Sequence, residues 1–197
     1  MLLSFLEMKK IFLSISFIVY LIFLFPYSST MANEEAPYDT VHKTDIYEIR
    51  NYSDRLVVQV INRSDDNSFR KLFNYISGAN NTSEEIKMTI PVTQTKKDNE
   101  SFMQFYLPSK FTKETIPIPS NSDIEIATIK EGYFAVIKYS GRSSDKNFVK
   151  YSKILYQKLL EDQILIKGSA IKATYNGPFT LPPFRRNEAM FNVDWKN

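Results

Sequence analysis

The sequence contains no cysteine and a single histidine, His42. Without cysteine the chain cannot form disulfides, bind a metal through thiolates, use a thiol nucleophile or attach a cofactor covalently through a thioether. One histidine leaves one possible base for a Ser-His-Asp triad and rules out zinc sites with two or more histidines. We therefore expect no structural metal, and a domain held together by its hydrophobic core alone.

Glycine is also scarce, at 5 residues, whereas Phe and Tyr number 15 and 12. This composition favours a packed, β-rich domain over a disordered chain. The formal net charge is only +3, which argues against a nucleic-acid partner. The adjacent acidic pairs Asp65-Asp66 and Glu84-Glu85 lie in polar, loop-like stretches, and no phosphate-binding loop or metal motif occurs. These features predict a protein that is not an enzyme.

The N-terminal residues have the pattern of an export signal. Lys9 and Lys10 precede the uncharged run Ile11–Phe25, and a small-residue site ends at Ala32. A permanent membrane span usually needs about 20 apolar residues. We therefore expect residues 1–32 to be a cleaved secretory signal that contacts the membrane transiently and directs the protein to a bacterial periplasm. An uncleaved membrane anchor is the alternative.

Residues 33–44 are polar and are expected to be a flexible tether, followed by a single domain over 45–195. The apolar residues Phe69, Leu72, Phe73 and Ile76 have the spacing i, i+3, i+4 and i+7, which predicts a helix that begins after Asn67 and ends before Gly78. A second helix is expected over 145–160. Runs of β-branched and aromatic residues predict strands. They cover 46–50 and 56–61, expected as a hairpin, and 86–93, 102–107, 169–175 and 186–193.

The two halves of this domain resemble each other. Tyr47-Glu48-Ile49 has a counterpart in Ile124-Glu125-Ile126, and Leu56–Val60 has one in Tyr133–Ile137. In each half a helix and two further strands follow. We interpret the chain as two ββαββ pseudo-repeats that close on each other in one α+β domain. Chance similarity of two β-rich halves is the alternative.

The segment Tyr175–Val193 combines turn residues, aromatic residues and two arginines. Arg185 and Arg186 lie beside Phe179, Leu181 and Phe184, so the arginines could hold the carboxylates of a flat apolar ligand. Alternatively, one arginine pairs with Glu188 or with a strand carbonyl. From Arg186 onward the residues alternate, which predicts a closing strand whose wetter face carries Glu188.

Several segments together resemble the SOUL haem-binding protein family. They are IYEIRNY at 46–52, FRKLFNYISGAN at 69–80, IKMTIPV at 86–92, FYLP at 105–108 and YNGPFTLPPFRRNEAMFNV at 175–193. The resemblance covers nearly the whole chain after residue 44. It implies a twisted, partly closed antiparallel sheet or barrel that is flanked by two helices, as in the bacterial effector-binding fold.

The resemblance also implies a function and a site. Family members bind haem or a related tetrapyrrole non-covalently in a hydrophobic groove at the first helix. Here its floor would be Leu72, Phe73 and Ile76. Arg185 and Arg186, which the resemblance does not assign, are our candidates for the ligand's carboxylates. The helix residues could equally be ordinary core, because a helix on a sheet needs such a stripe. The alternative function is an effector-binding or protein-interaction module for another small amphipathic ligand.

Iron ligation is where this chain departs from part of the family. Some members have a histidine, proposed as the axial ligand, at the position of Asn51, and asparagine does not replace imidazole on haem iron. His42 could do so only if the expected tether folds back, so a solvated histidine is the simpler reading. Met88 and Met190 could supply thioether ligands, although methionine in a strand is more typical of packing. We therefore expect binding without a histidine ligand.

Overall fold

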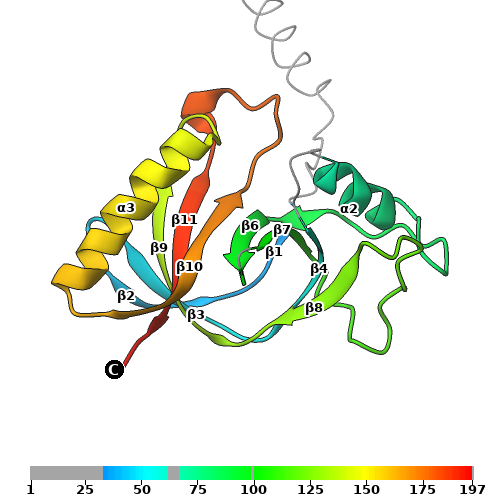
Figure 1. Cartoon of the computed structure of the whole chain (residues 1–197), viewed down its shortest axis with the longest axis horizontal. Coiled ribbons are helices and arrows are strands. Elements are labelled where there is room, and N and C mark those ends of the chain that lie inside the picture. Colours follow the sequence, from blue (N-terminus) through cyan, green and yellow to red (C-terminus); the bar gives the residue numbers. More distant parts are fainter. Residues whose placement is uncertain (1–32, 62–66, 99, 197) are drawn as a thin grey trace, which may run out of the picture. The chain divides into compact units, whose positions relative to one another are not determined.

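A computed structural model describes residues 33–61, 67–98 and 100–196, and shows a nine-stranded sheet, a two-stranded sheet and two α-helices (Figure 1). The predicted α+β class is correct. In chain order the elements are β1 (Glu34–Glu35), β2 (Asp39–Lys43), β3 (Glu48–Tyr52), β4 (Arg55–Ile61), α2 (Ser68–Ile76), β5 (Thr89–Ile90), β6 (Val92–Lys97), β7 (Glu100–Tyr106), β8 (Glu125–Ile129), β9 (Gly132–Tyr139), α3 (Asp145–Glu161), β10 (Leu165–Thr174), a 3₁₀ turn (Pro182–Phe184) and β11 (Asn187–Asp194).

The expected signal segment 1–32 lies outside the described residues, so its export role stays a prediction. Within the described part of the chain, neither helix has the length and apolar character needed to cross a lipid bilayer.

The large sheet is antiparallel throughout, in the order β2-β3-β9-β11-β10-β6-β7-β4-β8. Its end strands β2 and β8 do not pair with each other. The sheet is strongly curved (Figure 1) but forms no closed barrel. The expectation of a barrel was therefore too strong.

The predicted hairpin of β3 and β4 is wrong, because the two strands do not pair. β3 lies between β2 and β9, whereas β4 lies between β7 and β8. Alternating hydrophobicity identifies a strand and its buried face, but it does not identify the strand's partner. Ser53 and Asp54 thus carry the chain from one half of the sheet to the other.

The strand order has an internal symmetry. Without β2, it reads the same from either end when β3 is exchanged with β8, β4 with β9, β6 with β10 and β7 with β11. Two ββαββ halves that exchange their first strands would produce this order. The internal repeat itself stays a prediction.

The expected tether over 33–44 is wrong for most of its length. β1 pairs in parallel with β5, and β2 pairs with β3 at the edge of the large sheet. The residues from Asn33 onward belong to the same compact unit as the sheet. An edge strand has one neighbour and solvent on its other side, so its polar composition does not prevent it from pairing.

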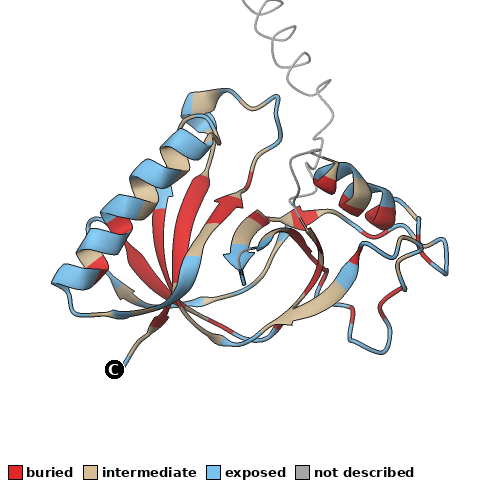
Figure 2. Ribbon diagram, viewed as in Figure 1, coloured by how far each residue is buried: buried red, intermediate tan, exposed pale blue. Residues whose placement is uncertain are grey.

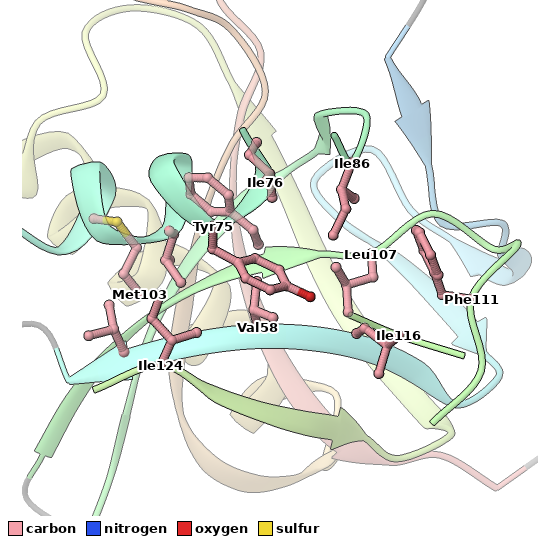
Figure 3. Packing of buried hydrophobic residues seen from close by; sticks show 12 residues of the cluster. Val58, Tyr75, Ile76, Ile86, Met103, Leu107, Phe111, Ile116 and Ile124 are labelled. Atoms are coloured by element: carbon pink, nitrogen blue, oxygen red, sulfur yellow. The ribbon is translucent and has the colours of Figure 1, made fainter. Parts of the chain in front are cut away.

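Both predicted helices are present, and each covers part of the same face of the sheet. α2 packs on β4 and β7 through Leu72, Tyr75 and Ile76, which join the cluster in Figure 3. α3 packs on β9, β10 and β11 through Leu155 and Leu159. Ser144 caps α3, since its hydroxyl accepts a hydrogen bond from the Asn147 amide at 3.3 Å.

The opposite, inner face of the sheet is buried as well. Along β11, Ala189 and Phe191 pack under α3, whereas Met190 packs with Phe134 and Val136 on the inner face. Figure 2 shows β9 and β11 buried along much of their length. Glu188 also points to the inner face and has no exposed surface. The predicted wetter face of this strand is therefore wrong, because other parts of the domain cover it.

Candidate functional site

A groove lies between α2 and α3, over the central strands β6 and β10. It consists of two adjoining cavities of about 360 and 460 Å³, which share Gln94 and Lys172. We call it the inter-helix groove. The α2 end is lined by Phe69, Met88, Val92, Met103 and the segment Tyr175–Pro178, and the α3 end by Asp145, Phe148, Val149 and Ala170.

Two aromatic rings form an apolar surface at the α2 end. Phe69 and Phe73 are 46% and 48% exposed, and their rings are nearly parallel, with 13° between the planes and 6.1 Å between centroids. Residues four apart on a helix lie side by side. Phe69 lines the cavity together with Met88 and Met103. This end of the groove can therefore receive a flat, apolar molecule.

A lysine lies where the two cavities meet. Lys172 on β10 is only 8% exposed, and its Nζ lies 2.8 Å from Oδ1 of Asp145, whose side chain is 88% exposed. A hydrogen bond from Lys172, with its positive charge, holds the pKa of Asp145 below its ordinary value. Because Asp145 is solvated, a carboxylate on a bound ligand can replace it on the ammonium at little cost.

The structure separates the five site residues that the sequence suggested. Leu72 and Ile76 lie in the core beneath α2, with 0% and 5% exposure, whereas Phe73 is exposed beside the groove. Arg185 donates from Nε to the Thr180 carbonyl at 2.7 Å and from Nη2 to the Pro178 carbonyl at 2.6 Å. It therefore braces the connection that forms one wall of the groove.

Arg186 lies in a cluster of charged side chains on the inner face of the sheet. Its Nε donates to Glu188 at 2.9 Å, and its Nη1 and Nη2 each donate to Glu35 at 2.8 Å. Of the alternatives left open for the arginines, the pairing with Glu188 occurs, at Arg186. Arg185 donates to carbonyls of the connection, not of a strand. Phe179 and Phe184 in this connection are largely exposed.

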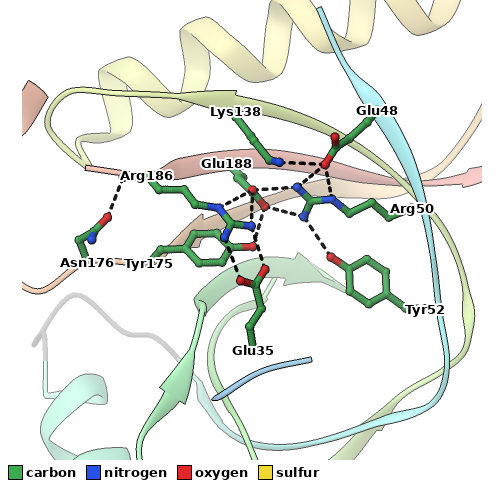
Figure 4. A network of polar contacts seen from close by, with 9 residues as sticks. All are labelled: Glu35, Glu48, Arg50, Tyr52, Lys138, Tyr175, Asn176, Arg186 and Glu188. Carbon is green, nitrogen blue, oxygen red and sulfur yellow. Dashed lines mark hydrogen bonds and ion pairs between the residues drawn. The ribbon is translucent and has the colours of Figure 1, made fainter. Parts of the chain in front are cut away.

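The centre of this charge cluster is the pair of Arg50 and Glu188, both 0% exposed (Figure 4). Two parallel hydrogen bonds of 2.9 Å join the guanidinium to the carboxylate. Glu48 accepts from Nε of Arg50 at 2.6 Å, and the Tyr175 hydroxyl donates to Glu188 at 2.6 Å. Every charge at the centre thus has an oriented partner, as buried charges require.

The pKa values of the cluster follow from these contacts. Burial alone would raise the pKa of Glu188, but the hydrogen bonds and charge of Arg50, helped by Tyr175 and Arg186, outweigh burial and lower it. Burial also raises the pKa of Tyr52 to about 12, although the charge of Arg50 opposes this. The cluster therefore keeps its ion pairs at neutral pH.

The candidate axial ligands His42, Met88 and Met190 lie in different parts of the domain. Among the described residues no group of three His, Asp or Glu side chains could hold a metal ion. His42 lies on β2, with its ring centroid 4.9 Å from that of Trp195. β3, β9, β11 and β10 separate β2 from β6. Met88 lines the groove, whereas Met190 lies in the core of the inner face.

Comparison with known families identifies the chain. The model of a family described as SOUL heme-binding protein matches residues 33–192. The chain belongs to the SOUL family. The resemblance found in the sequence is thereby confirmed, and haem binding is supported at the level of the family. A comparison with curated proteins gives no match.

Solved structures share the fold of this SOUL protein at low sequence identity. The C-terminal domain of EcmrR is 15% identical, with a TM-score of 0.56, over 80% of this chain and 98% of that one. A protein described as a hydrolase from Listeria innocua is 11% identical, with a TM-score of 0.52, over 78% and 94% of the two chains. These similarities support an antiparallel sheet with two helices and carry no information on ligand or activity.

Sequence reasoning missed two features of the groove in this SOUL protein. It assigned Lys172 no role, because a lysine between Ile171 and Ala173 in an alternating strand indicates a solvent-facing side chain, and nothing local shows that it is nearly buried. It also did not place Met88 and Met103 together. They come from separate segments, and only the folded sheet brings them to one cavity.

Proposed function

We propose that this SOUL protein is an exported, non-enzymatic binding protein that holds haem or a related tetrapyrrole non-covalently in the inter-helix groove. The observation that supports this most directly is the position of Lys172. It places one nearly buried cation at the junction of two cavities, beside an apolar end formed by Phe69, Met88 and Met103.

Burial of apolar surface supplies most of the affinity in this proposal. Removing apolar surface from water contributes roughly 25 cal/mol per Å². Cavities of about 360 and 460 Å³ lie within the range of small-molecule sites. A macrocycle at the α2 end would rest against Phe69 and Phe73. Its carboxylate edge would point along the groove toward Lys172, where it would take the place of Asp145.

Iron, where the ligand carries it, would have no imidazole from this chain. His42 is on the far edge strand and packs against Trp195. The role proposed for Arg185 also changes: it holds the wall at Pro178 and is not free to clamp a carboxylate. Arg186 is engaged on the inner face.

A haemin titration followed by absorbance tests the proposal. We expect a saturable change of the Soret band at low micromolar protein. The His42→Ala variant should give the same spectrum, because the imidazole is remote from the groove. Lys172→Met should weaken binding by about tenfold, as loss of one charge-assisted contact does.

The matched control is Lys153→Met, which removes an exposed lysine of α3 that does not line the groove. Its affinity for haemin should equal that of the unmodified protein. A titration without saturation would contradict the proposed ligand class. Equal affinities of the two lysine variants would contradict the proposed orientation.

A further inference from the structure

Arg55, the first residue of β4, is a buried arginine with unpaired N–H groups. It is 9% exposed, and its Nε and Nη2 are buried without a hydrogen-bond partner among the described residues. Its Cζ lies 4.0 Å from the ring centroid of Tyr52 and 4.8 Å from that of Phe134. These rings stabilise the charge through the faces of the guanidinium, but they accept none of the N–H bonds that point outward in its plane.

The carboxylates near Arg55 are engaged elsewhere. Glu188 and Glu48 bind Arg50, and Glu35 binds Arg186. Asp54 accepts from Nζ of Lys130 at 2.9 Å and from the amide of Glu131 at 2.7 Å. The interior therefore holds a guanidinium without a carboxylate of its own. A buried N–H without an acceptor costs free energy, and a carboxylate fits the guanidinium fork best.

Arg55 borders space that a small molecule can enter. It lines a cavity of about 220 Å³ with Thr89, Tyr106 and Phe111, and also a much smaller one toward Tyr52 and Tyr175. The larger cavity shares no lining residue with the inter-helix groove, and the smaller one shares only Tyr175. Aromatic rings thus surround the Arg55 guanidinium in the cavity walls. Such a site suits a ligand that has both a carboxylate and an aromatic ring.

Residues 33–38, which we call the N-terminal strap, form the remaining wall. Glu34, Ala36 and Pro37 line the larger cavity, and Glu35 and Ala36 the smaller one. The strap is held by the two residue pairs of β1 and β5, and by a hydrogen bond of 2.7 Å from the Ser109 amide to Glu34. Such a short pairing opens at low free-energy cost.

One ion pair fastens the strap to the inner face. Both carboxylate oxygens of Glu35 accept hydrogen bonds of 2.8 Å from Arg186 (Figure 4). The unpaired Nε and Nη2 of Arg55 are closed to solvent while the strap is in place. The strap lines both cavities that Arg55 borders, and the pair of Glu35 and Arg186 holds the strap in this position.

We propose that the cavity beneath the N-terminal strap is a second binding site, which takes a small aromatic carboxylate on Arg55 and is closed by the pair of Glu35 and Arg186. The site does not depend on tetrapyrrole binding, because Arg55 and the other residues of the larger cavity do not line the inter-helix groove. Failure of haemin to bind would therefore not contradict the proposed second site.

Benzoate is a suitable probe, and nuclear magnetic resonance of the arginine Nε–H groups reports on the contact directly. We expect benzoate to shift the Arg55 Nε–H signal saturably, and neutral benzamide to leave it unchanged. Glu35→Gln should bind benzoate about tenfold more tightly, because one charge-assisted contact that holds the strap is lost. Glu84→Gln, which removes an exposed partner of Lys110, is the matched control and should not change the affinity.

Arg55→Lys tests the arginine while it keeps the positive charge. It should weaken benzoate binding by about tenfold, since a single ammonium replaces the planar fork. Arg185→Met, an arginine outside the cavity, should bind as the unmodified protein does. The inference is overturned if the Arg55 signal does not respond to benzoate in the unmodified protein or in Glu35→Gln. It is equally overturned if Glu35→Gln and Glu84→Gln bind benzoate alike.

Discussion

At the scale of single residues, the central interaction on the inner face of the sheet is the ion pair of Arg50 and Glu188. The two residues are 138 positions apart in the chain and wholly buried. A buried pair of this kind adds little net stability relative to an apolar pair, but loss of one partner leaves the other charge uncompensated. Its value lies in fixing how β3, β9 and β11 align.

Glu188→Gln should destabilise the fold substantially. The substitution leaves Arg50, with no exposed surface, without its bidentate carboxylate. We expect a loss of about 3–5 kcal/mol in the free energy of unfolding, the range for a broken buried pair. Urea denaturation measures it. Glu84→Gln, at an exposed pair, should change the same quantity by less than about 0.5 kcal/mol.

The same residue should make stability depend on pH. The pKa of Glu188 in the folded protein lies below its ordinary value of 4.5. The contribution of Glu188 is therefore complete above about pH 4.5 and is lost as the pH falls through the folded-state pKa. Unfolding free energies of Glu188→Gln should show a shallower fall over this acidic range. Parallel pH profiles of the two proteins would contradict the assignment.

Neither partner of this pair could be recognised from the sequence. The alternation along β11 correctly placed Glu188 and Met190 on one face, but the sequence did not show that this face is covered. That cover comes partly from the segment expected to be a tether, where Glu35 reaches Arg186 and Tyr38 lies over Arg50. Contacts between residues so far apart leave no local pattern.

At the scale of elements, α2 shows what periodicity determines and what it leaves open. The spacing of Phe69, Leu72, Phe73 and Ile76 predicted the helix correctly. It did not show how much of the apolar stripe the sheet would cover. Leu72 and Ile76 are in the core, whereas Phe69 and Phe73 stay half exposed beside the groove. The residues proposed as one binding surface thus divide into supporting and exposed members.

Two alanine variants separate these roles. Leu72→Ala should cost about 2–5 kcal/mol in unfolding free energy, because it leaves a cavity under α2. Phe73→Ala should cost less, because the side chain is half exposed, and should weaken haemin binding, because its ring stacks on Phe69, which lines the groove. Leu160→Ala, which truncates an exposed residue of α3, is the control for binding. Equal haemin affinity in Phe73→Ala and Leu160→Ala would show that the ring takes no part.

Strand pairing was the element-level feature that the sequence predicted least well. The strands were located correctly at β3 and β4, but their predicted hairpin was wrong. Short loops favour hairpins, yet Tyr52 and Arg55 belong to different halves of the sheet and meet only through their side chains, as a ring and a guanidinium 4.0 Å apart. The pairing of β3 with β9 and of β4 with β8 overrides the local preference.

At the scale of the whole domain, the sheet presents two different faces. The helix-bearing face carries the inter-helix groove, and the inner face carries the charge cluster, Arg55 and the N-terminal strap. We place the proposed tetrapyrrole site on the helix-bearing face, because this face carries the groove and the family match supports haem binding. Arg186 is adjacent to Arg185 in the sequence, but it lies on the inner face and binds Glu188 and Glu35. It therefore does not brace the wall of the groove as Arg185 does.

The most direct test of the tetrapyrrole site is to follow the nuclear magnetic resonance signals of the methionine methyl groups while protoporphyrin is added. A bound macrocycle shifts nearby methyl signals through its ring current. Met88 and Met103 line the groove, whereas Met190 is buried on the inner face and serves as an internal control. We predict saturable shifts of Met88 and Met103 with Met190 unchanged. Shifts at Met190 with none at Met88 and Met103 would place the ligand on the other face and contradict the account.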